Sequence, residues 1–177
     1  MRNIMVDLET LGTKPDAVIL SIGAVFFDAD NLGKEFHRVL TIEDQQQVGR
    51  VIDPQTVEWW GSQSEAARAI FTAPNVATAQ GLDEFTAFCG DENISVWGNG
   101  ADFDCVLLGS LYESFKRKRP WSYSKNRCHR THKNTLKLPP GATGPARLGT
   151  HHNALDDAKY QALQLQHLFK HGKPTLE

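Results

Sequence analysis

Strand-like segments fill the first third of this chain, and their order limits the folds open to it. Residues 4–8 and 17–27 are rich in apolar, β-branched side chains, and residues 35–42 alternate between apolar and polar ones. Turn-forming residues separate the three segments at 11–16 and 28–33. We therefore predict an antiparallel meander in which residues 17–27 form a central strand.

Helical patterns begin at Asp53 and Pro54, which are typical of an N-cap and a first helical position. Ser64 precedes a second short helix, predicted to end at Phe71. Apolar periodicity predicts further helices at residues 78–88, 102–118 and 155–169. Short strands are predicted at residues 94–97 and 126–130, and a loop at the Gly- and Pro-rich residues 139–150. Strands followed by alternating helices and strands indicate an α/β domain with a mixed sheet.

No internal repeat, low-complexity block or long linker divides the 177 residues, so we expect one domain over residues 1–177 with a flexible tail at 171–177. The chain has no run of about 18 apolar residues and no signal-peptide pattern, so we expect a cytoplasmic protein without a membrane partner. Its three cysteines are odd in number and form no CxxC pair, which argues against a disulfide framework and a thiolate zinc site.

Two carboxylates share one face of the first predicted strand. Side chains alternate across a strand, so Asp7 and Glu9 point to the same side and lie roughly 6.6 Å apart along the chain. Both can therefore reach one metal ion. The alternative is a solvated strand end without a ligand.

Two later segments offer partners for these acids. Asp102 and Asp104 follow a short buried strand and a Gly-rich corner, where α/β proteins build their sites. One of the two can simply be the helix cap. His152 lies at the end of the Gly-rich loop, about one helical turn before Asp156 and Asp157. An exposed histidine and first-turn acids that only stabilise the helix dipole are the alternative.

Together these motifs resemble the DEDDh branch of the 3′-to-5′ exonucleases over residues 4–170. The resemblance rests on Asp7-x-Glu9, on Asn99 followed by Phe103-Asp104 at one residue more than the usual spacing, and on His152-x-Ala154-x-x-Asp157-Ala158. It implies an RNase H-like fold with a mixed five-stranded sheet flanked by helices. The matching acids are Asp104 and Asp157, and His151 has no counterpart.

The resemblance also implies a catalytic metal site. Two Mg²⁺ (or Mn²⁺) ions would be held by Asp7, Glu9, Asp104 and Asp157, an all-oxygen set that suits these ions better than Zn²⁺. We expect Asp7 to bridge both ions and His152 to act as the general base on the attacking water.

Four residues are expected to bind substrate by the same resemblance: Thr10, Leu11, Phe103 and Asn99. Leu11 would wedge a base and Phe103 would stack on one, although core packing fits either side chain equally well. Trp59 and Trp60 either stack on bases or pack their helix.

A basic stretch without one acidic residue runs from Ser114 to Leu155 and holds about half of the 19 Lys and Arg side chains. Such a region next to an acidic metal pocket would attract a phosphate backbone. A solvated helix end and loop is the alternative.

These observations predict a metal-dependent 3′-to-5′ exonuclease that releases nucleoside 5′-monophosphates from single-stranded DNA or RNA 3′ ends. Three alternatives stay open: an oligoribonuclease-like enzyme restricted to short substrates, a noncatalytic nucleic-acid-binding module, and an adaptor that binds a protein through its paired tryptophans. The subgroup most similar to the chain consists of small phage and bacterial exonucleases, which places the protein in a bacterial or phage-infected cytosol. The choice between DNA and RNA, and between a monomer and a homodimer, does not follow from the sequence.

Overall fold

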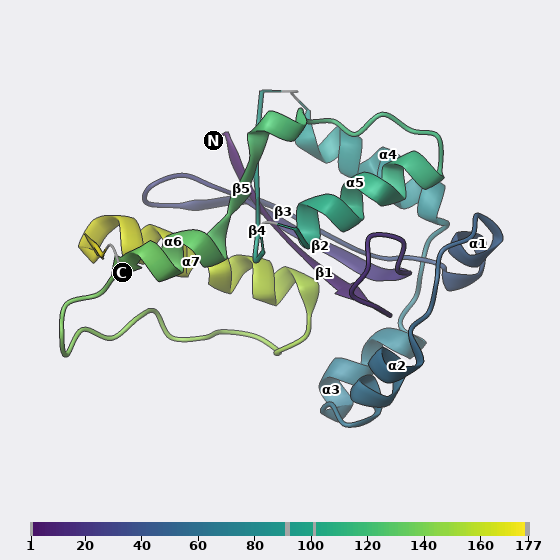
Figure 1. Ribbon diagram of the computed structural model, residues 1–177, viewed down its shortest axis with the longest axis horizontal. Coiled ribbons are helices and arrows are strands. Elements are labelled where there is room, and N and C mark those ends of the chain that lie inside the picture. Colours follow the sequence, from purple (N-terminus) through teal and green to yellow (C-terminus); the bar gives the residue numbers. More distant parts are fainter. Residues whose placement is uncertain (1, 91–92, 101, 176–177) are drawn as a thin grey trace.

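The computed structural model describes residues 2–90, 93–100 and 102–175. It contains a five-stranded sheet in the order β3-β2-β1-β4-β5, with helices on both faces (Figure 1). β1 pairs antiparallel with β2 and parallel with β4, so the predicted mixed sheet is confirmed. The strands are β1 (Asn3–Thr10), β2 (Ile19–Phe27), β3 (Leu32–Val39), β4 (Ser95–Gly98) and β5 (Asn126–Cys128).

Most predicted helices are present, with the capping residues in place. The side chain of Asp53 accepts a hydrogen bond from Gln55 N at 2.9 Å, and that of Ser64 accepts one from Ala67 N at 3.2 Å. The helices are α2 (Pro54–Gly61), α3 (Glu65–Arg68), the 3₁₀ turn η1 (Ala69–Thr72), α4 (Thr78–Cys89), α5 (Asp104–Ser114) and α7 (Ala154–His171).

Several boundaries differ from the prediction. β3 starts at Leu32 and stops at Val39, and Ile42 begins an unpredicted helix, α1 (Ile42–Gln47). The side chain of Gln45 explains this, because it bonds to both Ile19 N at 2.9 Å and Ile19 O at 2.8 Å. A contact between distant segments therefore fixes α1.

The predicted strand at residues 126–130 and helix at residues 102–118 are both shorter than expected. Cys128 ends β5 and caps the unpredicted helix α6 (His129–Thr135), accepting a hydrogen bond from Thr131 N. α5 starts only at Asp104 and ends at Ser114, since Lys116 adopts a positive φ of 55° that an α-helix does not allow. A 3₁₀ turn, η2 (Tyr123–Lys125), then leads into β5.

Part of the predicted flexible tail pairs with another segment. β7 (Lys173–Pro174) pairs antiparallel with β6 (Leu136–Lys137), while residues 176–177 lie outside the described part of the chain. The mobility of the tail stays a prediction. Within the described ranges, no helix has the length and apolar character that a membrane span requires.

The alternation of β1 sorts its side chains onto two layers. Ile4, Val6 and Leu8 face the core cluster that includes α4 and α5 residues. Met5 packs on the other side, in the cluster with Ala158 of α7. The odd-numbered residues of β1 therefore face α7, and Asp7 and Glu9 share that side, as the sequence pattern predicts.

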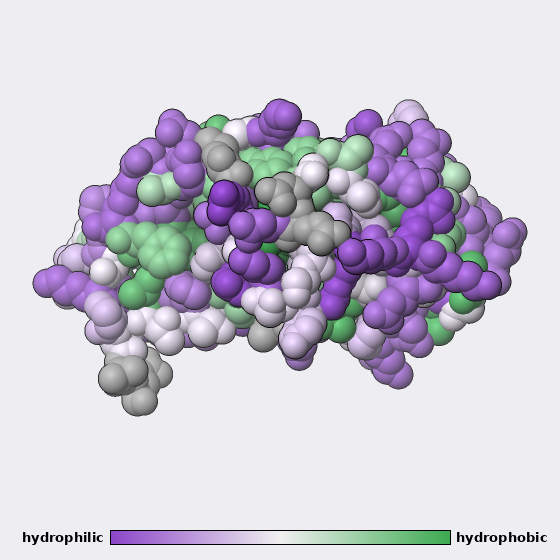
Figure 2. Space-filling view, turned by 90° about the horizontal axis from the view of Figure 1, so that it is seen from above, coloured by the Kyte–Doolittle hydropathy of each residue, from purple (hydrophilic) through white to green (hydrophobic). Residues whose placement is uncertain are grey.

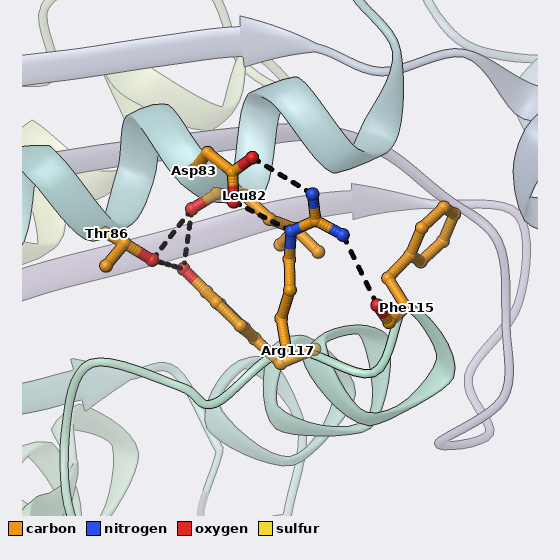
Figure 3. Close-up of polar contacts among 6 residues, drawn as sticks. Leu82, Asp83, Thr86, Phe115 and Arg117 are labelled. Carbon is orange, nitrogen blue, oxygen red and sulfur yellow. Dashed lines mark hydrogen bonds and ion pairs between the residues drawn. The ribbon is translucent and has the colours of Figure 1, made fainter.

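Polar contacts at the surface join α4 and α5, the two helices that pack on the Ile4, Val6 and Leu8 side of β1. Arg117, just after α5, donates to both carboxylate oxygens of Asp83 on α4, at 2.7 and 3.0 Å (Figure 3). Nearby, the Tyr112 hydroxyl donates to Leu82 O at 3.0 Å and lies 2.9 Å from the Thr86 hydroxyl. The view from above shows mainly hydrophilic side chains with small apolar patches between them (Figure 2).

Candidate active site

Four acidic side chains from three elements surround the carboxyl end of β1. Asp7 and Glu9 come from β1, Asp104 opens α5, and Asp157 lies in the first turn of α7. Carboxylate oxygens of Asp7, Glu9 and Asp157 lie within 4.8 Å of one another. Asp104 lies close enough for its charge to raise the pKa of both Asp7 and Glu9. The structure thus gathers acids that are up to 150 positions apart in the sequence.

A glycine allows α7 to come this close to the sheet. Gly23 of β2 pairs with Asp7 of β1, and a Cβ at this position would lie only 2.1 Å from the carbonyl carbon of Ala154. The first turn of α7, which carries Asp157, therefore rests directly on the backbone of β2. Any side chain at Gly23 would push that turn away from Asp7.

The corner after β4 holds Asp104 in a fixed orientation. Its carboxylate accepts hydrogen bonds from Asn99 N at 2.7 Å and from Leu8 N at 3.2 Å. Gly98 leaves room for it, because a Cβ there would lie 2.8 Å from an Asp104 oxygen. Asp102 is exposed and precedes the helix, whereas Asp104 is buried. The structure thus places Asp104 in the acid cluster.

The two adjacent acids of α7 have different partners. Asp156 accepts a hydrogen bond from Thr150 N at 2.8 Å and so holds the end of the preceding loop. Asp157 accepts one from His152 N at 2.9 Å and forms an ion pair with Arg147. Asp157 is therefore the acid that faces the other carboxylates, and Asp156 anchors the loop.

Burial raises the pKa of Asp7, Glu9 and Asp104, and neighbouring negative charge adds to the shift at Asp7 and Glu9. Burial, followed by the charges of Asp104 and Glu9, raises the pKa of Asp7 well above its usual value. Burial and then Asp104 raise the pKa of Glu9 to about 8, and burial raises that of Asp104 to about 6. The hydrogen bond from Gln161 Nε2 to Asp7 at 2.7 Å opposes the shift at Asp7. A divalent cation would relieve this repulsion, and the all-oxygen donor set suits Mg²⁺ or Mn²⁺.

His152 lies beside the acids in an unusual backbone conformation, with a φ of 62°. Its imidazole, that of His151 and the Asp157 carboxylate each offer a ligand atom within 4.8 Å of the others. The two imidazole rings lie 3.9 Å apart, and the ring of Trp59 meets that of His152 edge-on at 4.9 Å. Burial, then the nearby charges of His151 and Arg147, lower the pKa of His152 below its usual value.

Two clefts meet at Leu8 and Glu9. The first, of about 390 Å³, contains the side chains of Asp7, Asp157 and His152. The second, of about 450 Å³, extends toward α2. It is lined by Thr10, Thr13, Asp53, Trp59, Trp60 and Phe103, among others. An extended ligand can therefore pass from the second cleft to the acids.

The four predicted substrate-binding residues have different surroundings. Thr10 and Phe103 line the second cleft, and Asn99 lines the first. The backbone N–H of Asn99 is used by Asp104, and its side chain lies 3.3 Å from His129 Nδ1. Leu11 is buried in a core cluster with Trp60. The buried position of Leu11 thus favours core packing over contact with a base.

Trp59 and Trp60 have different surroundings, although the sequence left base stacking and helix packing open for both. Trp60 is buried and donates from Nε1 to Thr10 O at 2.9 Å, so it packs α2 against the end of β1. Trp59 is 44% exposed and lines the second cleft. Only Trp59 is free to meet a ligand with much of its surface.

The basic residues of the 114–155 stretch also fall into two groups, one at the cleft and one away from it. Arg117 pairs with Asp83 on the α4 surface (Figure 3). In contrast, Lys133 and Arg147 line the first cleft, and Arg130 donates to Asn99 O at 2.6 Å beside it. Positive charge from α6 and the loop therefore borders the acids, whereas Arg117 lies outside the cleft.

Gln161 and His129 lie near the acids but were not singled out from the sequence. Arg147 was expected there only as part of the basic stretch, and His151 was given no role. Gln161 follows Asp157 by four positions on one helix, a spacing that places both on the same face and could have identified it. No local pattern singles out His129, because it comes from a segment that only the fold brings to the cleft.

Comparison with known families gives a match over almost the whole chain. Residues 2–169 match the 3′-5′ exoribonuclease Rv2179c-like domain. The exodeoxyribonuclease of Enterobacteria phage T4 is 25% identical over 132 residues, which cover 66% of this chain and 58% of the phage protein. The matched segment thus spans little more than half of that relative.

Solved structures share the fold. Escherichia coli exonuclease I in complex with a dT13 oligonucleotide has a TM-score of 0.67 at 15% identity, covering 96% of this chain and 41% of the other. The nuclease domain of 3′hExo, a DEDDh family member bound to rAMP, has a TM-score of 0.64 at 14% identity, covering 98% of this chain and 96% of the domain. These similarities confirm the RNase H-like fold predicted from the sequence.

Proposed function

Since this chain belongs to the 3′-5′ exoribonuclease Rv2179c-like domain family, a DEDDh-type group, we propose that it removes nucleoside 5′-monophosphates from the 3′ ends of single-stranded nucleic acid. The observation that carries the proposal is the convergence of Asp7, Glu9 and Asp157, with ligand oxygens within 4.8 Å of one another. Buried carboxylates are costly to keep together, and a cation-dependent reaction explains why this chain does so.

Asp7, Glu9, Asp104 and Asp157 would hold two Mg²⁺ or Mn²⁺ ions. Such ions neutralise phosphoryl charge and make a bound water more acidic. The chain itself fixes the carboxylates. The backbone N–H groups of Asn99 and Leu8 orient Asp104, and the side chain of Gln161 orients Asp7.

His152 is proposed as the general base. A base must be unprotonated before the reaction, and burial together with neighbouring positive charge lowers the pKa of this imidazole. Its backbone N–H donates to Asp157 Oδ2, which holds the backbone of His152 beside that carboxylate. The imidazole would accept the proton of the water that attacks the terminal phosphodiester.

The second cleft is proposed to hold the terminal nucleotide. It opens beside Glu9, and the exposed ring of Trp59 and the partly buried ring of Phe103 offer faces for base stacking. Lys133 and Arg147 border the first cleft, where they can meet the phosphates. The family description names RNA, whereas the phage relative is named for DNA, so both sugars have to be tested.

The test uses 5′-labelled single-stranded DNA and RNA of matched sequence, in long and short versions, with Mg²⁺, with Mn²⁺ and with chelator. A ladder that shortens from the 3′ end only when metal is present is the expected result. Products from the shortest oligonucleotides alone would instead indicate an oligoribonuclease-like enzyme. Binding without any product under all metal conditions would refute the proposed hydrolysis and favour a noncatalytic module.

The role of His152 is tested by comparing two neighbouring substitutions. His152→Ala is expected to slow turnover by roughly 10² or more while substrate affinity changes little. His151→Ala is the matched control, since it removes an imidazole from the same cleft. Equal losses in both variants, or none in His152→Ala, would exclude His152 as the specific base.

A further inference from the structure

Arg147 brings a positive charge into the acid cleft from the loop that precedes α7. Its guanidinium forms an ion pair with Oδ1 of Asp157 and lies over the ring of Tyr160, 4.9 Å from the ring centroid. The side chain is 29% exposed, so it reaches inward from the cleft wall. Figure 1 shows the loop running alongside α7 before it enters that helix.

The field of this guanidinium extends beyond Asp157. Its charge also lowers the pKa of Asp7 and Glu9, against the larger effect of burial. Arg147 is therefore a counter-ion for three of the acids proposed to bind metal. In the same cleft, Lys133 is a second cation, but it forms no ion pair with Asp157 in the described structure.

The two oxygens of Asp157 are both engaged. Oδ2 accepts the backbone N–H of His152, and Oδ1 pairs with Arg147. A divalent ion that binds Asp157 through Oδ1 therefore competes with Arg147 for this oxygen. Three residues after Arg147, Thr150 N donates to Asp156, which anchors the end of the loop.

A substrate phosphate is a suitable new partner for the displaced guanidinium. Its Nε is buried and has no hydrogen-bond acceptor within the described residues, so at least one donor is unused. Guanidinium groups bind phosphate oxygens through paired N–H donors. Stacking on Tyr160 would keep the group at the cleft wall after the ion pair opens.

We propose that Arg147 is an exchangeable counter-ion: it neutralises the metal-free acid cluster, is displaced from Asp157 by a divalent cation, and then binds a phosphate of the substrate strand. The inference rests on the proposed function of this cleft. It makes metal binding and substrate binding cooperative. A bound metal ion frees Arg147 for the substrate phosphate, and a bound phosphate keeps Arg147 away from Asp157 and so leaves this carboxylate free for the metal.

The first experiment measures metal binding alone. Mn²⁺ is titrated into the wild-type chain and into Arg147→Gln, and free Mn²⁺ is followed by electron paramagnetic resonance. Loss of the competing ion pair should tighten Mn²⁺ binding by about fivefold, which corresponds to about 1 kcal/mol. Lys133→Gln removes one positive charge from the same cleft but keeps the Arg147–Asp157 ion pair, so the Mn²⁺ affinity of this variant should change less. Unchanged or weaker Mn²⁺ binding in Arg147→Gln, or an equal gain in Lys133→Gln, would overturn the inference.

The second experiment measures substrate binding without turnover. A fluorescent single-stranded 8-mer is titrated in Ca²⁺, with either a normal or a methylphosphonate terminal linkage that lacks the phosphate charge. Replacing the normal linkage by methylphosphonate should weaken binding of the 8-mer to the wild type several-fold. The Arg147→Gln variant should bind both 8-mers weakly, with little difference between them. Equal losses in the two proteins would refute the phosphate contact. Failure of the wild type to bind Mn²⁺ or the 8-mer would instead refute the proposed function itself.

Discussion

Substitution of Gly23 by alanine should damage the active site through the backbone of α7. The backbone of Gly23 has an ordinary negative φ, so alanine is conformationally allowed there and would normally stabilise a chain by about 0.4–1 kcal/mol. Here, however, the new Cβ would lie 2.1 Å from the carbonyl carbon of Ala154 and 2.2 Å from Leu155 N, and ordinary contact begins near 3.4 Å. The start of α7 must therefore retreat by about 1 Å, and overpacking of this size costs about 1–3 kcal/mol.

The retreat would move Asp157, three residues after Ala154, away from Asp7. A misplacement of about 1 Å can cost about 10² in rate, so Gly23→Ala should lose far more activity than its stability loss explains. The assay combines thermal unfolding with kcat on a labelled oligonucleotide at a temperature where the variant is fully folded.

Gly61→Ala is the matched control, because a Cβ at Gly61 would meet nothing within 4 Å. We expect it to keep full activity and to be as stable as the wild type or slightly more stable. A Gly23→Ala variant with wild-type turnover would show that the close approach of α7 to β2 does not set the position of Asp157.

The remaining predictions concern the aromatic and imidazole side chains around the clefts. Trp60→Ala should reduce the free energy of unfolding by about 3–5 kcal/mol in urea titrations, whereas Trp59→Ala should leave it nearly unchanged and raise KM for oligonucleotides, because stacking contributes about 1–3 kcal/mol per base. Equal destabilisation by both changes would contradict this division. Burial lowers the pKa of His129 to about 4 from 6.5. Between these values the unfolded chain binds more protons, so stability should fall as pH drops, by at most about 1.4 kcal/mol per unit. His129→Gln should lack this component, and an identical pH profile in the variant would refute it.

Much of the fold follows from short-range patterns. The capping side chains of Asp53 and Ser64 were predicted, because a cap acts within three residues of itself. α1 was missed because Gln45 stabilises it by bonding to Ile19, 26 positions away. α6 was missed because its apolar periodicity is weak and a cysteine supplies its cap.

In the candidate site, too, short-range patterns predicted some features, and contacts between distant residues decided the others. Alternation along one strand is enough to place Asp7 and Glu9 on the same side. His152 lies before α7, so its position relative to Asp157 depends on its positive φ rather than on helical spacing. Sequence could not decide which tryptophan is buried, since both lie on one short helix. The bond of Trp60 to Thr10 O and its packing in the core cluster with Leu11 distinguish them.

The sequence by itself determined the types and local orientation of the acids, because backbone geometry repeats every two residues in a strand and every 3.6 in a helix. The tertiary structure alone decided the distances between them and the charges that surround them. Gly23 allows α7 to reach β2, and the loop places Arg147 on Asp157. Such contacts join residues far apart in the chain, and they depend on how whole elements pack rather than on any local pattern.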